Sequence, residues 1–166
     1  DLVPYDSQST LIAADSTELQ VARGSVQVDA SGARQATLFF HPGTGAQAAF
    51  SDGTSRMLEE LTVRATEYTV GSNGPNRMPA SLPLTTAYTY ALELSVDEAV
   101  LQGATRVDFN QSVSLYVENF LGFPVGSPVP VGYYDYSFSS WLPSENGRIV
   151  EIVGQLADTA LIDIDG

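Results

Sequence analysis

Acidic side chains are the residues of this sequence best able to do chemistry. The 166 residues include 20 Asp and Glu against seven basic residues, all Arg, for a formal net charge of -13. A pair of carboxylates can hydrolyse a glycoside without any histidine or cysteine. Candidates for such a pair are Glu59, Glu60, Glu67, Glu93, Asp97, Glu98, Glu118 and Asp135. Because acids this numerous form pairs by composition alone, a carboxylate-pair glycosidase ranks last of the functions considered.

Two aspartates near the end of the chain have the spacing of metal ligands. Asp163 and Asp165 are separated by one residue and followed by Gly166. An Asp-x-Asp sequence places carboxylates on one side of a loop, as the first ligands of calcium loops do. A full loop needs more ligands after residue 166. We therefore expect no cofactor, or calcium if the parent protein continues into a calcium-binding segment; the alternative is an acidic tail.

Aromatic residues gather between positions 133 and 141. In a strand, Tyr134, Tyr136 and Phe138 would share one face and Tyr133 would lie on the other. Exposed rings could stack on sugars, which would make the chain a carbohydrate-binding module. Alternating tyrosines are equally ordinary material of strands and interfaces. The predicted ligand or partner surface comprises Tyr133, Tyr134, Tyr136 and Trp141.

Other catalytic signatures are weak. The sequence has one histidine, His41, and no cysteine. A serine triad needs a histidine held by an acid, and a hydrolytic zinc site needs several histidines or cysteines. Residues 43–48 fit the pattern G-x-G-x-x-A, but Asp52-Gly53 follows too soon for a cofactor-binding helix. We predict a turn at 43–48 and a protein that is not an enzyme.

Alternation with a period of two predicts an all-β fold, an antiparallel β-sandwich. The clearest case places Tyr88, Tyr90, Leu92, Leu94 and Val96 on one face. Further predicted strands cover residues 19–22, 26–29, 36–40, 61–65, 107–109, 113–117, 132–137 and 148–153. Asn146-Gly147 predicts a hairpin turn. One helical turn is expected near 97–102, capped by Asp97 and closed by Gly103.

Charge and hydropathy limit the domain organisation and the classes of partner that we expect. We predict an N-terminal linker or edge strand over 1–14, a β-sandwich domain over 15–157 and an acidic tail over 158–166. A chain this acidic is repelled by phosphate backbones and anionic membrane surfaces, so nucleic acid is not an expected partner. No apolar run approaches the ~20 residues that span a bilayer, so membrane insertion is not expected.

From Leu61 onward the sequence resembles a module found upstream of the repeats in large bacterial RHS/YD-repeat proteins. The resemblance covers most of residues 36–153, and Gly24–Ala36 is similar to the opening strands of ZU5-like sandwiches. The matching segments are residues 61–71, 73–75, 78–79, 88–90, 93–99, 116–126, 131–135 and 141–148. The resemblance implies an Ig-like or ZU5-like sandwich, found outside the cell or at the bacterial cell surface. It implies a structural or adhesive role, with neighbouring domains, a cell-surface protein or a glycan as partners, and it brings no catalytic residues.

Overall fold

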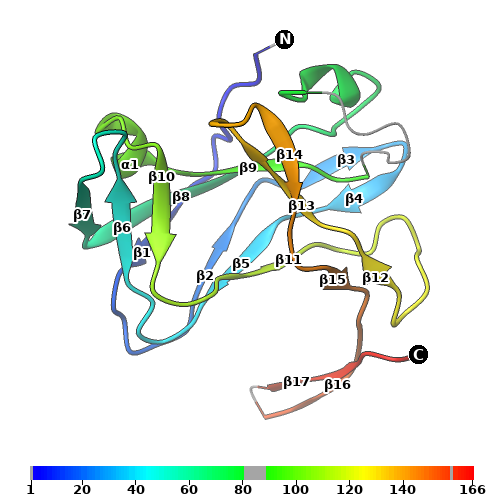
Figure 1. Cartoon of the computed structure of the whole chain (residues 1–166). Helices are drawn as coiled ribbons and strands as arrows, with labels where there is room; N and C mark the ends of the chain where they lie inside the picture. The colour runs from blue at the N-terminus through cyan, green and yellow to red at the C-terminus, as the bar shows by residue number, and fades with distance from the viewer. Residues whose placement is uncertain (1, 81–88, 158) are drawn as a thin grey trace. The chain divides into compact units, whose positions relative to one another are not determined.

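Short antiparallel β-strands form nearly all of the regular secondary structure described for this protein, which confirms the predicted all-β class. The computed structural model describes residues 2–80, 89–157 and 159–166. The chain divides into two units, and Figure 1 labels the strands of both. Unit 1 comprises Asp1–Arg77 and Tyr88–Glu118, and unit 2 comprises Met78–Ala87 and Asn119–Gly166. This division does not follow the predicted boundaries at residues 14 and 157.

Unit 1 holds three three-stranded sheets and one hairpin. Their orders are β1-β8-β9, β10-β6-β7 and β11-β5-β2, and β3 pairs with β4. The strands are β1 (Thr10–Ala13), β2 (Gln20–Arg23), β3 (Gln27–Asp29), β4 (Gly32–Arg34), β5 (Thr37–Phe40), β6 (Ala46–Ala49), β7 (Ser55–Leu58), β8 (Glu60–Glu67), β9 (Leu92–Val96), β10 (Arg106–Phe109) and β11 (Ser114–Tyr116).

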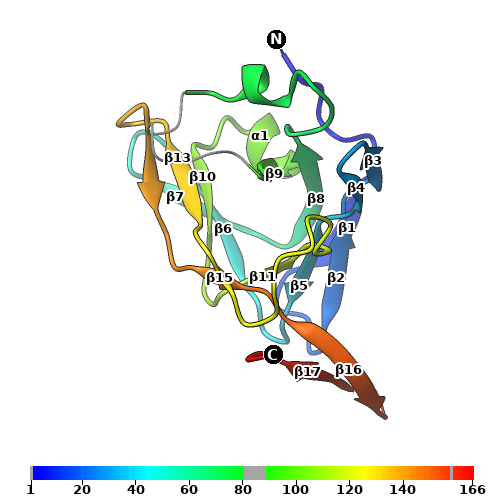
Figure 2. The ribbon, with the colours of Figure 1, turned by 90° about the vertical axis from the view of Figure 1, so that its right-hand side faces the viewer.

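The core lies where these three sheets surround one interior (Figure 2). Phe40, Ile12 and Leu61 are its largest fully buried side chains, and they come from three different strands. Along β8, Leu61, Val63 and Ala65 point inward while the residues between them are less buried. The period-two pattern seen in the sequence therefore selects the buried face of this strand.

Two short helical pieces complete unit 1, namely η1 (Gly74–Arg77) and α1 (Asp97–Leu101). The helical turn predicted near 97–102 is present, and the N–H of Gly103, at φ 72°, donates to the Val100 carbonyl. The predicted Asp97 cap is wrong. The N-cap residue is Val96, because Asp97 lies in the first turn and pairs with Arg64 instead. In the described part of the chain, no helix is long and apolar enough to cross a membrane.

Unit 2 consists of three two-stranded pairs, β12–β15, β13–β14 and β16–β17. None of its described residues is buried. The strands are β12 (Pro128–Val129), β13 (Gly132–Asp135), β14 (Ser140–Pro143), β15 (Gly147–Arg148), β16 (Glu151–Leu156) and β17 (Thr159–Asp163). Residues 159–163, expected within an acidic tail, therefore form a strand.

The hairpin turn predicted at Asn146-Gly147 is wrong. Neighbouring strands β14 and β15 do not pair with each other; β14 pairs with β13, and β15 pairs with β12. Tyr134 stands opposite Trp141 in the pair that forms. Cross-strand aromatic contacts of this kind stabilise the pairing that forms. The predicted strand over 148–153 is likewise divided between β15 and β16.

The strand predicted across Tyr88–Val96 is shorter than expected. Only Leu92–Val96 form β9, and Tyr88 lies outside the described residues. Its predicted apolar face is also uneven, because Val96 is buried whereas Leu94 is exposed. Ser95, from the opposite face, is buried. Both faces of this edge strand are therefore partly covered.

Candidate functional site

The β13–β14 hairpin of unit 2 gathers three of the four aromatic residues that the sequence analysis selected. Tyr134 and Trp141 are cross-strand partners, and their rings meet edge to face with centroids 5.6 Å apart. Tyr136 packs on Tyr134 in the same manner, at 5.1 Å and 88°. Tyr133 stands opposite Leu142 and points to the other face of the hairpin. The structure thus builds a three-ring cluster and leaves Tyr133 out of it.

The tip of this hairpin presents further aromatic surface. Asp135 Oδ1 accepts hydrogen bonds from the backbone N–H groups of Ser137 and Phe138, at 2.8 and 3.2 Å. These bonds close the turn and hold the residues at its tip. Tyr136 is 71% exposed and Phe138 is 73% exposed. Large aromatic side chains this exposed, on a turn with defined geometry, are typical of contact surfaces.

Trp141 ties the hairpin to the beginning of unit 2. Its indole Nε1–H donates to the carbonyl of Ala80, 3.4 Å away. Indole donors that are partly buried usually find such an acceptor. The contact fixes the plane of the ring against which Tyr134 packs. Trp141 is also the single tryptophan of the sequence, which makes it a specific fluorescent reporter of this hairpin.

Asp163 and Asp165, the predicted metal ligands, lie close to each other at the end of β17, and the Asp163 carboxylate binds backbone N–H groups. Asp163 Oδ1 accepts the backbone N–H groups of Asp165 and Gly166, at 3.0 and 3.1 Å. These bonds favour the ionised carboxylate and lower the pKa of Asp163. Across the hairpin, Asp163 stands opposite Glu151. Among the described residues no three His, Cys, Asp or Glu side chains are grouped as metal ligands, and calcium binding stays a prediction.

An open hollow of about 500 Å³ in unit 1 collects three of the carboxylates considered as catalytic pairs. Glu59, Glu60 and Glu98 line it. Glu98 accepts hydrogen bonds from the N–H and the hydroxyl of Thr62, at 2.8 and 2.6 Å. Burial opposes ionisation, but these bonds leave the pKa of Glu98 below its usual value. A glycosidase acid needs a raised pKa, so Glu98 is tuned in the opposite direction.

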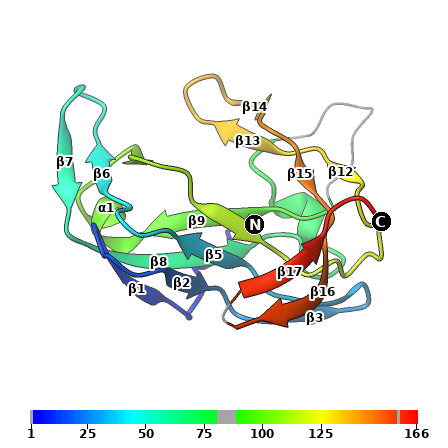
Figure 3. The ribbon, with the colours of Figure 1, turned by 90° about the horizontal axis from the view of Figure 1, so that it is seen from below.

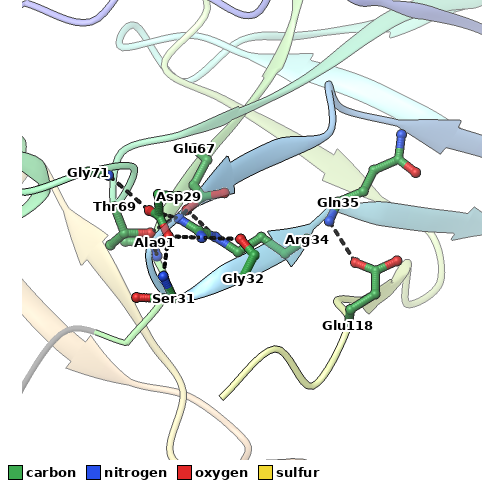
Figure 4. Close-up of polar contacts among 10 residues, drawn as sticks. All are labelled: Asp29, Ser31, Gly32, Arg34, Gln35, Glu67, Thr69, Gly71, Ala91 and Glu118. Carbon is green, nitrogen blue, oxygen red and sulfur yellow. Dashed lines mark hydrogen bonds and ion pairs between the residues drawn. The ribbon is translucent and has the colours of Figure 1, made fainter. Parts of the chain in front are cut away.

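A buried ion-pair cluster at the end of β4 was missed by the sequence analysis (Figure 4). The Arg34 guanidinium donates from Nε and Nη2 to Glu67 Oε1, at 2.8 and 2.6 Å, and from Nη1 and Nη2 to the two oxygens of Asp29, at 2.8 and 2.9 Å. The Arg34 and Glu67 side chains are only 2% and 4% exposed. These bonds hold the pKa of Asp29 well below its usual value and raise that of Arg34.

The same cluster fastens a loop to the sheet. The Thr69 hydroxyl donates to Glu67 Oε1 at 2.8 Å, and the Gly71 N–H donates to Asp29 Oδ2 at 2.9 Å (Figure 4). Burial, aided by the Glu67 charge, raises the pKa of the neighbouring Tyr90 phenol. Asp29 and Glu67 both lie in unit 1, which makes their cluster with Arg34 a structural tie within that unit. No local signal in the sequence links residues 29, 34 and 67.

His41 and the glycine-rich stretch after it form a clamped turn. Residues 46–49 are strand β6 and not a cofactor-binding helix, as expected, but the turn predicted over 43–48 is too long because it ends before Ala46. Asn110 makes two hydrogen bonds to the backbone of this turn. Its Nδ2 donates to the Gly43 carbonyl, and its Oδ1 accepts a hydrogen bond from the Gly45 N–H. Gln111 donates to the His41 and Pro42 carbonyls. These side-chain hydrogen bonds hold the backbone of the turn in one conformation.

Comparisons with known proteins leave the resemblance to RHS/YD-repeat modules as an expectation. Neither a protein-family model, nor a curated protein, nor a solved structure matches the chain. The candidate contact surface of this protein therefore rests on its own geometry: the β13–β14 hairpin with its exposed Tyr136 and Phe138.

Proposed function

We propose that this chain is a non-catalytic structural and interaction domain of a large exported bacterial protein of the RHS/YD-repeat type. It positions neighbouring modules of that larger protein or contacts a cell-surface partner. The observation that carries the proposal is the β13–β14 hairpin, in which ring packing holds Tyr136, and a hydrogen bond to Asp135 holds Phe138, in exposed positions. The resemblance running from Leu61 to Arg148 supports the extracellular location.

The construction of unit 1 supports a scaffold role. Its interior is packed from three sheets, and its buried Arg34 cluster ties the β3–β4 hairpin to β8. A rigid scaffold lowers the conformational entropy lost when a partner binds. The aromatic hairpin of unit 2 supplies rings that bury much apolar area at low entropic cost, since each ring has only two side-chain torsions.

The test is binding of the fluorescently labelled chain to intact bacterial cells and to purified cell-wall sacculi. The double variant Tyr136→Ala/Phe138→Ala removes the two most exposed rings of the hairpin and leaves the Tyr134–Trp141 pair in place. We expect it to lose at least ~10-fold in affinity, because exposed aromatic anchors carry much of the energy of such contacts. Tyr5→Ala, which removes an exposed ring from unit 1, is the matched control and should bind as the parent chain does.

Two results would contradict this assignment. The parent chain could bind neither preparation, which would remove the proposed cell-surface contact. Alternatively, the control and the double variant could lose affinity equally, which would show that binding is unspecific. A cooperative thermal transition of each variant must accompany the assay, so that a loss of folding is not counted as a loss of binding.

Carbohydrate binding is the second candidate, and the exposed faces of Tyr136 and Phe138 favour it. The rings of Tyr134 and Tyr136 stand at 88° to each other and so share no common plane. A sugar would therefore stack on single rings at the tip and not along a flat strip. A glycan array combined with quenching of Trp141 fluorescence tests this candidate, and silence in both measurements would reject it.

A further inference from the structure

Strand β17 of unit 2 has an open edge. It pairs with β16 from Leu156↔Thr159 to Glu151↔Asp163, and within the described part of unit 2 no third strand joins this pair (Figure 3). An unpaired edge offers a row of N–H and C=O groups to any strand that can align with it. A hairpin of two strands is only marginally stable in water, so a third or fourth strand adds stability.

The side chains of the hairpin reinforce the need for a partner. Leu161 is 46% exposed, and Leu156, Ile152 and Ile162 are more exposed still. The pairing places Ile152 opposite Ile162 on one face, and Leu156 and Leu161 project from the other. Both faces are therefore apolar, and extending the sheet would bury part of each.

Four other strands of unit 2 have edges that are less suitable for pairing. β16 is interrupted by a register shift between Ile152 and Gly154, which twists its edge. β14 ends at Pro143, which lacks an N–H donor. β12 and β15 have two residues each. β17 has five residues, no proline or glycine and no register shift along Thr159–Leu161.

The sequence of β17 is complementary to itself when two copies run antiparallel. A two-fold axis at Leu161 sets Leu161 opposite Leu161 of the second copy and Ala160 opposite Ile162. It sets Thr159 opposite Asp163, where the hydroxyl can donate to the carboxylate. No carboxylate then faces another across the new pairing, which would be destabilising. We propose that this protein self-associates through β17, forming a four-stranded sheet across a two-fold axis.

This pairing is independent of the aromatic hairpin and goes beyond the proposed function. Its dependence on salt distinguishes it from other contacts, because two copies with a net charge of -13 repel each other at long range. Salt shortens the range of that repulsion. Self-association should therefore strengthen as salt is raised, whereas binding of a basic partner to the same edge would weaken.

The interface is small. One strand pair buries less than the ~1,200 Å² of total area typical of a stable complex. We therefore expect a reversible dimer whose population rises with protein concentration, and not a permanent one. Sedimentation velocity over a range of protein concentrations, at low and at high salt, measures this equilibrium directly.

The decisive variant is Leu161→Lys. It places two ammonium groups opposite each other at the two-fold axis, and we expect the dissociation constant of the dimer to rise at least ~10-fold. The matched control is Leu101→Lys, which makes the same chemical change on helix α1 of unit 1, where Leu101 is 86% exposed. Both variants make the net charge less negative by one, so a loss confined to Leu161→Lys cannot come from long-range repulsion.

Hydrogen exchange supplies a second measurement that does not depend on a variant. The amides of β17 should exchange more slowly as the concentration rises, while those of β13 stay unchanged. The proposal is overturned if the parent chain stays monomeric at every concentration and salt. It is overturned equally if Leu101→Lys weakens the dimer as much as Leu161→Lys, or if association weakens with salt.

Discussion

The two units of this protein differ in where they place their apolar side chains. Unit 1 buries Phe40, Ile12 and Leu61 among three sheets, whereas unit 2 has no buried residue among those described and exposes Tyr136, Phe138 and the aliphatic residues of β16 and β17. Unit 1 therefore has an apolar core, whereas unit 2 has none among its described residues, although both units also expose apolar side chains. This difference supports the proposal that unit 1 provides the stable part of the protein and unit 2 the contact surface.

Hydrogen exchange should show the largest contrast between the units. The amides of β8 lie in the central strand of a three-stranded sheet over the core, while β16 and β17 form a two-stranded pair. At low protein concentration we expect β8 to exchange only through global unfolding, and β16 and β17 through local opening that costs far less free energy. Equal protection of the two regions would remove the basis of the comparison.

Removing one phenylalanine from each unit should lower the stability by very different amounts. Phe40 is 1% exposed, so Phe40→Ala leaves a cavity and should cost about 3–5 kcal/mol in the free energy of unfolding. Phe138→Ala removes a ring that is mostly in water and should change stability by less than about 0.5 kcal/mol. Urea unfolding of both variants tests this, and a large cost for Phe138→Ala would show that its ring is covered in solution.

Breaking a buried ion pair should cost more than breaking an exposed one. Arg34→Met leaves Glu67 and Asp29 without their cation in unit 1 and should destabilise it by about 3 kcal/mol. Arg106→Met breaks an exposed pair with Asp108, and we expect its urea midpoint to match that of the parent chain within error. If the two variants are equally stable, the Arg34 cluster does not act as a tie.

Acid should weaken the structure through Asp29 in particular. Its folded-state pKa lies below the ordinary 3.8, because Arg34 donates to the ionised carboxylate. The unfolded chain therefore takes up this proton first, so the stabilisation is complete above about pH 5 and is lost as the pH falls through 4 toward the folded pKa. Asp29→Asn should show a smaller loss of stability between neutral pH and pH 3 than the parent chain.

The control for the acid experiment lies in unit 2. Asp163 also has a lowered pKa, but its partners are backbone N–H groups at the exposed end of the hairpin. Because solvent screens that site, Asp163→Asn should leave the acid dependence of unfolding almost unchanged. If Asp163→Asn changes the acid dependence of unfolding and Asp29→Asn does not, then Asp163 and not Asp29 is responsible for the loss of stability in acid. Unfolding midpoints measured by circular dichroism across this pH range decide between the two.

Several elements could be predicted from local patterns, and others could not. The alternation along residues 61–65 predicts the buried face of β8, and Gly103 predicts the end of α1, since both depend on neighbours in the chain. Asn146-Gly147 failed as a hairpin signal, because β14 pairs with β13 and β15 with β12, and the dipeptide does not record these partners. Alternation correctly predicts that Tyr133 faces away from Tyr134 and Tyr136, whereas the contact between Trp141 and Tyr134 depends on how β13 and β14 pair.

The sequence by itself determined the all-β class, the acidic surface and the aromatic segment at 133–141, because composition and period-two alternation are properties of neighbouring residues. Only the tertiary structure decided which strands pair, that Arg34 joins Asp29 to Glu67, and that β17 pairs with β16 alone among the described strands. These features join residues far apart in the chain or depend on which strands find partners. Their free energy comes from burial and pairing in three dimensions, which no local pattern records.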